Sequence, residues 1–385
     1  MSCYETLHIK RIINASEPYT NLGGSLMEKE TVQAMAQAAE CCIDYEALRD
    51  AVCEKAAQLT KNEAAFVTTG ASSGLELSAG ACMCLGQEEK MDMLPDTSAF
   101  SRNEIIVLDG DVLDIIPYWK LAGLTGAKII KVRPDAESVK NAVCEKTAAC
   151  MLFPSSVYER GIPVCEEIIP ILKETGVKII VDAAAQLPPA SNLWYYTKEL
   201  GADLTIFSGG KHIKGPQSTG LIVGDKELIR LCKMLASPNP RLGRAFKTGK
   251  EELVGFITAL ELFAAEDEER RFKKQEEKLL RIAEAVRERT GIRTEMLHQG
   301  RLGTYQPLLH LYLPENMTAK SCNEYARSLD PAVDIGVYPP EFNREDNVVF
   351  VNAYNLKEGE EAIVADVICD YILGNQNGCR SEGEV

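Results

Sequence analysis

Six short apolar segments alternate with helical patterns between residues 64 and 207, and this alternation constrains the fold more than any other feature. Each segment is mostly apolar at both alternating positions, as expected of a strand that is covered on both faces. The intervening stretch PVCEEIIPILKETG (163–176) has helical spacing, begins at a proline and ends at a glycine. The sequence therefore predicts an α/β fold with a doubly wound sheet. The segments are AAFVTT (64–69), EIIVL (104–108), AKIIKV (127–132), AACMLF (148–153), VKIIVD (177–182) and DLTIF (203–207).

After about residue 235 the sequence changes to long charged helical patterns, which are followed by the short apolar segments PLLHLYL and NVVFVNAYN. This change in sequence pattern predicts a second, smaller α+β domain at 236–374. We expect the large domain at 46–235, an N-terminal segment at 1–45 that packs with the small domain, and a frayed tail at 375–385.

The chain of 385 residues is long enough for a compact core, with 45% hydrophobic and 26% charged residues. Its 42 basic and 57 acidic residues give a net charge of −15. A nucleic-acid partner is disfavoured, because binding its phosphates would work against the field of the whole protein. An anionic ligand of this chain must therefore be small and held locally.

The N-terminal residues lack the pattern of a secretory signal, and no apolar run approaches the roughly 20 residues of a membrane helix. We therefore expect a cytoplasmic protein with no membrane partner. The thirteen cysteines include no pair of Cys-x-x-Cys motifs, which favours a reducing compartment and disfavours a zinc site. Cys82 and Cys84 lie in an apolar helical pattern, where core packing explains them better than metal ligation.

The residues that follow the predicted strands are the candidate site, because ligands of open α/β sheets bind beyond the carboxyl ends of the strands. The first strand ends in TTGASSG, where Gly70, Ala71, Ser72 and Ser73 lead into a helix. Small residues allow backbone N–H groups at a helix start to converge on an anion, and the serine hydroxyls can add hydrogen bonds. The turn suits a phosphate group, although Gly and Ser also form ordinary strand-to-helix turns.

Two further strand ends each carry one charged residue. Asp182 ends the VKIIVD strand before three alanines, where it either caps the next segment or faces a cationic partner. The small side chains after it would let a flat ring approach. Lys211 follows DLTIF after a Ser-Gly-Gly turn. At the mouth of an apolar site, a lysine loses its proton more easily and can form a Schiff base. The alternative roles for Lys211 are a solvated surface lysine and a lysine that binds a substrate phosphate.

An anion-holding turn, an acid and a lysine at strand ends meet the requirements of pyridoxal phosphate, which are a phosphate cup, an anionic partner for the ring nitrogen and an amine for the aldehyde. The segments INASEPYTNLGGSL, VDAAAQLPP, SGGKHIKGPQSTG and GRAFKTGKEELVGFITALE resemble fold-type-I pyridoxal-phosphate enzymes of the selenocysteine synthase-like group. Within that group, the sequence looks most similar to the D-glucosaminate-6-phosphate ammonia-lyase branch, over roughly residues 10 to 370.

The resemblance implies a seven-stranded, mostly parallel sheet whose last strand, TGLIVG, runs antiparallel, with a smaller α+β C-terminal domain. It also implies pyridoxal 5'-phosphate as cofactor, and a homodimer or higher homo-oligomer with its sites at subunit boundaries. It makes Lys211 the Schiff-base lysine and Asp182 the partner of the ring nitrogen. Ser218 would lie in a loop that reaches the neighbouring subunit's cofactor. The other residues that would surround the cofactor are Gly70, Ala71, Ser72, Ser73, Gln186 and Ser208.

Other cations lie near these motifs. Lys214 competes with Lys211 in the same loop, but Lys211 lies closer to the strand end that should face the ring. Arg244 and Lys247, together with Lys250, form a basic cluster in an otherwise acidic chain. This cluster either solvates the start of a helix or grips a carboxylate or phosphate of the substrate.

Two departures from the lyase branch bear on the substrate. Glu17 stands where the relatives tend to have glycine, and a charged side chain cannot adopt glycine's positive φ at low cost. The segment VLDGDVLDIIPYW lacks the histidine that would stack on the cofactor.

The expected activity is α,β-elimination with release of ammonia from a small amino acid or a phosphorylated amino-sugar acid, which gives a 2-oxo acid. Racemisation and transamination are the alternatives, and tRNA-dependent selenium transfer is a less favoured one.

Overall fold

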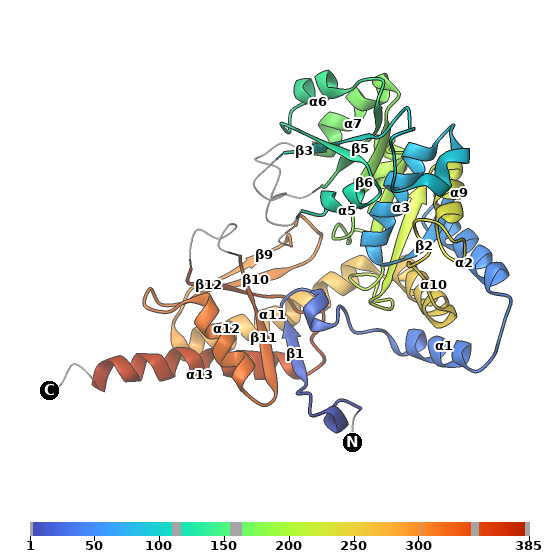
Figure 1. Ribbon diagram of the computed structural model, residues 1–385. Helices are drawn as coiled ribbons and strands as arrows, with labels where there is room; N and C mark the ends of the chain where they lie inside the picture. The colour runs from blue at the N-terminus through green and yellow to red at the C-terminus, as the bar shows by residue number, and fades with distance from the viewer. Residues whose placement is uncertain (1–2, 110–116, 155–163, 301, 340–345, 382–385) are drawn as a thin grey trace. The chain divides into compact units, whose positions relative to one another are not determined.

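The protein divides into two compact units, each with its own hydrophobic core. One unit is Ser25–Glu266, and the other combines Met1–Gly24 with Asp267–Val385. The computed structural model describes residues 3–109, 117–154, 164–300, 302–339 and 346–381 (Figure 1).

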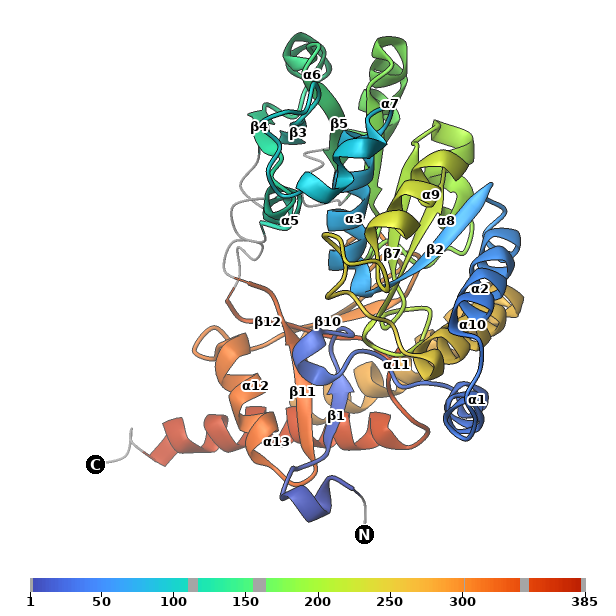
Figure 2. The same cartoon turned by 45° about the vertical axis from the view of Figure 1, so that its right-hand side comes forward.

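The larger unit is built around a seven-stranded sheet with the strand order β2-β8-β7-β6-β5-β3-β4 (Figures 1 and 2). The last strand, β8, is antiparallel to both of its neighbours, and the other adjacent pairs are parallel. This arrangement confirms the fold class expected from the sequence. The strands are β2 (Ala64–Thr69), β3 (Glu104–Leu108), β4 (Lys128–Val132), β5 (Thr147–Leu152), β6 (Lys178–Asp182), β7 (Leu204–Ser208) and β8 (Thr219–Gly224).

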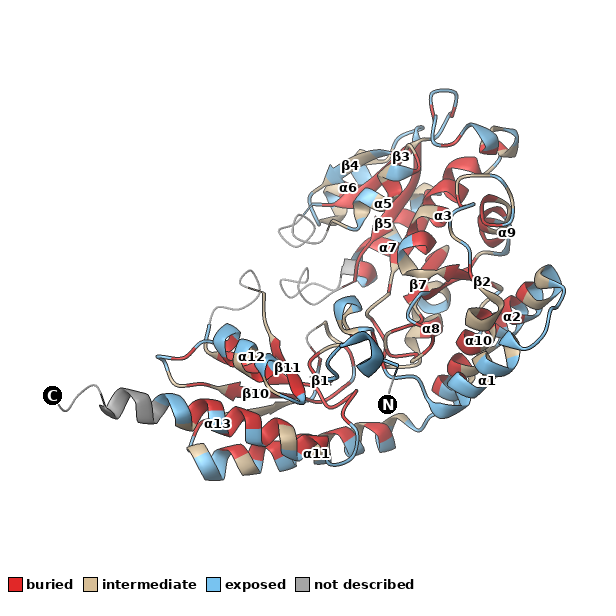
Figure 3. Ribbon diagram, turned by 60° about the horizontal axis from the view of Figure 1, so that its bottom comes forward, coloured by how far each residue is buried: buried red, intermediate tan, exposed pale blue. Residues whose placement is uncertain are grey.

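Apolar side chains at both alternating positions bury the middle of this sheet. Every residue of β3, β5 and β8 is buried, and Figure 3 shows the buried residues gathered in the strands and in α3. Aspartates begin several of the covering helices: Asp44 accepts a hydrogen bond from Ala47 N at 3.1 Å, and Asp225 accepts one from Leu228 N at 2.9 Å. The helices of this unit are α1 (Lys29–Ala39), α2 (Tyr45–Leu59), α3 (Gly70–Cys84), α5 (Trp119–Leu124), α6 (Ala136–Ala142), α7 (Val164–Thr175), α8 (Asn192–Trp194), α9 (Lys226–Leu235) and α10 (Lys250–Ala265).

The larger unit includes the helices on both sides of its sheet-forming segment. Residues 25–45 and 236–266 are grouped with this unit. The physical reason is that α1 packs along α10, and α10 in turn packs on α2. The boundary falls at Asp267, whose side chain accepts a hydrogen bond from Arg270 N at 3.0 Å and starts a new helix.

The smaller unit has a five-stranded sheet with the order β1-β11-β12-β10-β9. Its edge strand β1 comes from the N-terminus and runs parallel to β11, whereas the other pairs are antiparallel. The last helix extends into the expected tail, of which residues 382–385 lie outside the described residues. The elements are β1 (Ile12–Ala15), β9 (Thr294–Leu297), β10 (Leu308–Tyr312), β11 (Ala332–Val337), β12 (Val348–Val351), α11 (Glu268–Thr290), α12 (Ala319–Ser328) and α13 (Glu360–Ser381).

Within the described ranges, no helix combines the length and the apolar character that crossing a membrane requires.

Candidate active site

The register of the large sheet brings the predicted strand ends to one edge. Thr69, the last residue of β2, pairs with Thr219 of β8, and Ser208 of β7 pairs with the next residue of β8. Asp182 ends β6 and pairs with Ile206, two residues before the end of β7. The turn before α3, the loop that carries Lys211 and the acid at the end of β6 therefore share the carboxyl-end edge of the sheet.

Asp182 is a partly buried carboxylate whose charge interacts with that of Lys211. Its Oδ1 accepts a hydrogen bond from Ala184 N at 3.0 Å. Burial raises the pKa of Asp182 above its ordinary value, and the hydrogen bond and the positive charge of Lys211 offset this only in part. A desolvated carboxylate of this kind suits a cationic partner such as a protonated ring nitrogen.

The two glycines before Lys211 are required by packing. A Cβ on Gly209 would collide with Thr219 Oγ1, and one on Gly210 would collide with the backbone of Gln217. Gly209 N also donates a hydrogen bond to Thr219 O at 2.8 Å. Only glycine lets the chain leave β7 this close to β8, and the result is a partly buried Lys211 at the strand end.

The helix α3 begins with Gly70 in the left-handed region, at φ 75°. The side chain of the preceding threonine does not cap the first turn. The buried Ser73 hydroxyl donates to Thr69 O at 2.8 Å, whereas Ser72 is exposed at the helix start. A Cβ on Gly220 of β8 would lie 2.6 Å from Ala71 N, so this glycine lets the helix start approach β8 just after the lysine loop. The turn fits an anion bound by backbone N–H groups, with Ser72 as the hydroxyl at its mouth.

Gln186 and Ser218 hold neighbouring segments in place. Gln186 Nε2 donates to Pro154 O, which follows β5, at 2.6 Å. Ser218 Oγ donates to Glu252 of α10, whose other carboxylate oxygen accepts a hydrogen bond from Gly249 N at 2.7 Å. Both side chains therefore have partners within the protein that fix the loops around the sheet edge.

The predicted basic cluster is split by the structure. Arg244 and Lys247 are exposed on the segment between α9 and α10. Lys250 Nζ instead donates to Ala38 O at the end of α1 and pairs with Glu251 at 2.5 Å. Lys250 therefore ties α1 to α10, whereas Arg244 and Lys247 stay at the surface.

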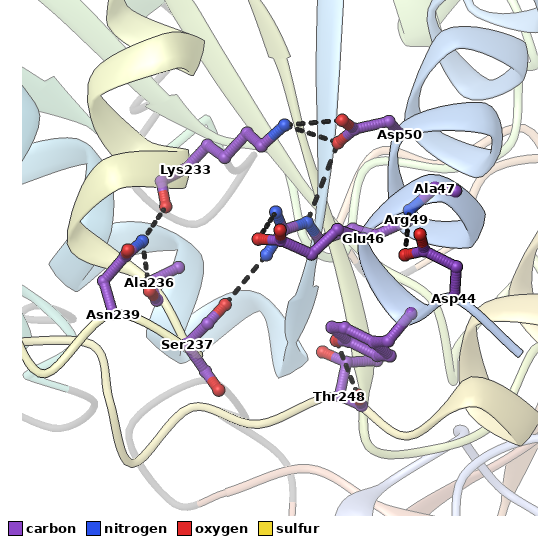
Figure 4. Close-up of polar contacts among 11 residues, drawn as sticks. Asp44, Glu46, Ala47, Arg49, Asp50, Lys233, Ala236, Ser237, Asn239 and Thr248 are labelled. Atoms are coloured by element: carbon purple, nitrogen blue, oxygen red, sulfur yellow. Dashed lines mark hydrogen bonds and ion pairs between the residues drawn. The ribbon is translucent and has the colours of Figure 1, made fainter.

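A pair of threonines that the sequence did not predict joins the turn before α3 to the segment before α10. The Oγ1 atoms of Thr69 and Thr248 lie 3.2 Å apart. Thr248 O accepts a hydrogen bond from Tyr45 OH at 2.8 Å, and nearby the buried Arg49 donates to Ser237 O at 2.9 Å (Figure 4). Helix α2 thus fixes residues 236–249 next to the predicted phosphate cup. Because Thr69 directly precedes Gly70, its place beside the predicted phosphate cup could have been inferred from the sequence. No local pattern indicates that Thr248 is its partner.

The cysteine pair Cys82 and Cys84 lies in the core of α3. Burial raises the pKa of the Cys84 thiol to about 12, which opposes ionisation of this thiol to a metal-binding thiolate. Over the part of the chain that the structure describes, no cluster of three or more His, Cys, Asp or Glu side chains could hold a metal ion.

The structure also bears on the two departures from the lyase branch. Glu17 is not among the non-glycine residues with positive φ, so this position does not have the backbone conformation that favours glycine. Its carboxylate accepts a hydrogen bond from Asn352 Nδ2 at 3.3 Å within the smaller unit. Residues 110–116, from the segment without a histidine, lie outside the described residues. Tyr118 follows them, and burial together with the negative charge of Asp182 raises the pKa of its phenol.

Comparison with known sequences identifies relatives of the chain. Residues 101–241 match the aminotransferase class-V family. D-glucosaminate-6-phosphate ammonia lyase of Salmonella typhimurium is 31% identical over 67% of this chain and 69% of its own length. The 5'-C-glycyluridine monooxygenase-decarboxylase of a Streptomyces species is also 31% identical, over 73% of this chain and 70% of its own. An L-seryl-tRNA(Sec) selenium transferase of Clostridium perfringens is 26% identical over 68% of this chain and 58% of its own.

Solved structures agree with the sequence relatives. The structure of D-glucosaminate-6-phosphate ammonia-lyase matches with a TM-score of 0.80 and 25% identity, over 97% of this chain and 99% of that one. Ureidoglycine-glyoxylate aminotransferase from Bacillus subtilis matches with a TM-score of 0.62 and 12% identity over 94% and 93%, which shows the fold alone. The chain therefore belongs to the fold-type-I pyridoxal-phosphate enzymes, in the selenocysteine synthase-like group that includes D-glucosaminate-6-phosphate ammonia lyase.

Proposed function

We propose that the protein is an ammonia lyase that acts by α,β-elimination on a small amino acid or a phosphorylated amino-sugar acid and yields a 2-oxo acid. The observation that carries the proposal is that Asp182, the turn before α3 and the loop of Lys211 lie at the same carboxyl-end edge of the large sheet. The ammonia lyase of Salmonella typhimurium, at 31% identity, supports this reaction class.

Each residue at this edge has one role in the proposal. Lys211 would hold the cofactor through its aldehyde group, and the free Nζ of Lys211 would take the proton from the substrate Cα. Asp182 holds a proton on the ring nitrogen through its carboxylate. When bound, pyridoxal phosphate supplies the electron sink that lets the Cα–H bond break. The N–H groups at the start of α3, with the hydroxyls of Ser72 and Ser208, hold the phosphate.

Arg244 and Lys247 are the proposed anchors for a carboxylate or phosphate of the substrate. Both are exposed cations on the segment that Thr248 fixes next to the turn before α3. A bidentate arginine and a mobile lysine suit an anionic substrate group. Charge-removing changes at these two positions should therefore raise KM more than they lower kcat.

The proposal includes a cytoplasmic homodimer or larger homo-oligomer. Twelve of the thirteen cysteines have side chains that the structure describes, and all twelve are free thiols. Free thiols agree with a reducing compartment. Around α1, which is largely exposed in Figure 3, Leu26, Val32 and Ile43 leave 51%, 49% and 45% of their surface accessible. A second copy of the chain would cover these apolar side chains.

The test is product analysis with a panel of β-hydroxy amino acids and sugar amino acids. A lyase re-forms the bond between Lys211 and the cofactor in each cycle, so ammonia and a 2-oxo acid accumulate without an added keto-acid acceptor. An aminotransferase stops after one turnover until a 2-oxo acid is added, and a racemase inverts Cα without ammonia. Either of these outcomes would overturn the elimination reaction.

The Streptomyces relative favours one second candidate, because its identity to this chain equals that of the ammonia lyase and its name describes an oxygen-dependent decarboxylation. The same panel is therefore run under air and under argon with an oxygen electrode. Elimination consumes no oxygen and proceeds equally under both gases. Turnover that requires oxygen and releases carbon dioxide would establish the second candidate instead.

A further inference from the structure

Lys214 has an unusual backbone in the loop that carries Lys211. Its φ is 57°, in the left-handed region that costs free energy for any residue with a Cβ. Lys214 N donates to Lys211 O at 3.0 Å, and Gly215 N donates to Gly209 O at 2.8 Å. These two hydrogen bonds close the turn, so the conformation of Lys214 fixes the peptide group of Lys211. Its side chain must offset a cost that glycine would avoid.

The Lys214 side chain forms an ion pair with the start of α1. Its Nζ lies 2.7 Å from Glu28 Oε1, and the two side chains are 23% and 51% exposed. Glu28 is the N-cap residue of α1. Three residues earlier, Ser25 N donates to Gly210 O at 2.9 Å. The segment 25–28 therefore contacts the loop on both sides of Lys211.

Helix α10 packs against both α1 and the loop that carries Lys211. A Cβ on Gly255 would lie 2.8 Å from Met35 Sδ of α1 and 3.0 Å from Pro216 Cγ of the loop. Because α1, α10 and the loop meet this closely, a shift of α1 is transmitted to the loop rather than absorbed by free space.

We propose that Glu28 and Lys214 are positioning residues, which hold the backbone of Lys211 and thereby the Nζ that bonds the cofactor. The inference rests on the proposed function, which gives that bond to Lys211. A half-exposed ion pair contributes little to global stability, whereas small displacements of a bond-forming atom are costly to its reaction. The pair should therefore act on cofactor retention and kcat rather than on unfolding.

The experiment uses the cofactor-loaded enzyme and the variants Glu28→Gln, Lys214→Gly and the double variant. Cofactor release is followed by absorbance after transfer to cofactor-free buffer, and kcat, KM and Tm are measured. Each single variant should release the cofactor about two- to fivefold faster, the range that an exposed ion pair supports, with a similar fall in kcat and an unchanged KM. The double variant should equal Lys214→Gly, since both changes remove one interaction. Lys214→Gly should keep its Tm, because glycine relieves the left-handed strain.

A second ion pair provides the matched control. Lys55 of α2 pairs with Glu261 of α10, and their side chains are 51% and 42% exposed. Glu261→Gln should leave cofactor release and kcat unchanged. Release at the wild-type rate from both single variants, or additive effects in the double variant, would overturn the inference. A wild-type protein that carries no cofactor on Lys211 would instead defeat the proposed function, so the two failures are distinguishable.

Discussion

Two aspartates at opposite ends of the neighbouring strands β6 and β7 have different surroundings. Asp203, just before β7, accepts hydrogen bonds from Lys178 Nζ at 2.7 Å and from Ile179 N at 2.8 Å. Asp182 ends β6 at the other edge, where burial raises the pKa of its carboxyl in spite of the hydrogen bond from Ala184 N. One carboxylate is paired within the fold, and the other keeps a charge that a bound cation would stabilise. Electrostatic balance, rather than residue type, therefore separates a structural acid from a candidate catalytic one.

Removal of Lys211, the cation at the same sheet edge as Asp182, should have the largest effect. Lys211→Ala removes the amine that bonds the aldehyde, so turnover should be lost entirely and borohydride should no longer fix the cofactor to the chain. Peptide mapping of the borohydride-treated wild-type protein should identify Lys211. Modification at Lys214 would show that the wrong lysine of the loop has been assigned.

Asp182→Asn should have the next largest effect. Loss of the negative charge removes the group that holds the ring-nitrogen proton, and one misplaced electrostatic stabiliser typically costs about 10²-fold or more in rate. The cofactor should remain bonded to Lys211, because that bond does not involve the acid. Steady-state kinetics and the absorbance spectrum check both points, and nearly normal kcat would remove Asp182 from its role.

The matched change at the other edge is Asp203→Asn. It removes the nearer of the two carboxylates that pair with the partly buried Lys178, whose side chain and that of Asp203 are 26% and 21% exposed, and leaves only Asp225 at 4.0 Å. We expect a loss of about 1 to 3 kcal/mol in the free energy of unfolding, with kcat within about twofold of wild type. Denaturant titration measures the first and kinetics the second. A large loss of kcat without a loss of stability would contradict the assignment of Asp203 as a structural acid and Asp182 as the catalytic one.

The smallest effect concerns pH and the cofactor-free protein. Since burial raises the pKa of Asp182, its protonated form stabilises the fold fully below the ordinary pKa of 3.8, and this contribution is lost as pH rises through the folded-state pKa. At neutral pH, Asp182→Asn should therefore raise the Tm of the cofactor-free protein, by a few degrees at most, and the gain should shrink in acid. Thermal scans from pH 4 to pH 7 test this, and a gain independent of pH would contradict it.

The sequence was sufficient where structure depends on local pattern. The strands Ala64–Thr69 and Glu104–Leu108 coincide with their predicted segments, because each is a continuous apolar run with a clear end. The unit boundary at Asp267 is not apparent in the sequence, since α10 and α11 form one nearly continuous helical pattern with only a capping aspartate between them. Contacts that form only in the folded chain could not be predicted from local sequence patterns. Thr69 meets Thr248 across 179 residues, and Lys214 meets Glu28 across 186.

The antiparallel strand β8 has a consequence for the order in which the protein assembles. It follows β7 after a short loop, so this hairpin closes locally, whereas its pairing with β2 joins Thr69 to Thr219 and must wait for the whole intervening chain. The proposed phosphate cup starts where β2 ends, and Lys211 lies in the hairpin. The two halves of the proposed site therefore first meet in this non-local pairing step. A chain without this pairing would not bring the two halves together, so we expect loading of the cofactor to follow the pairing of β2 with β8.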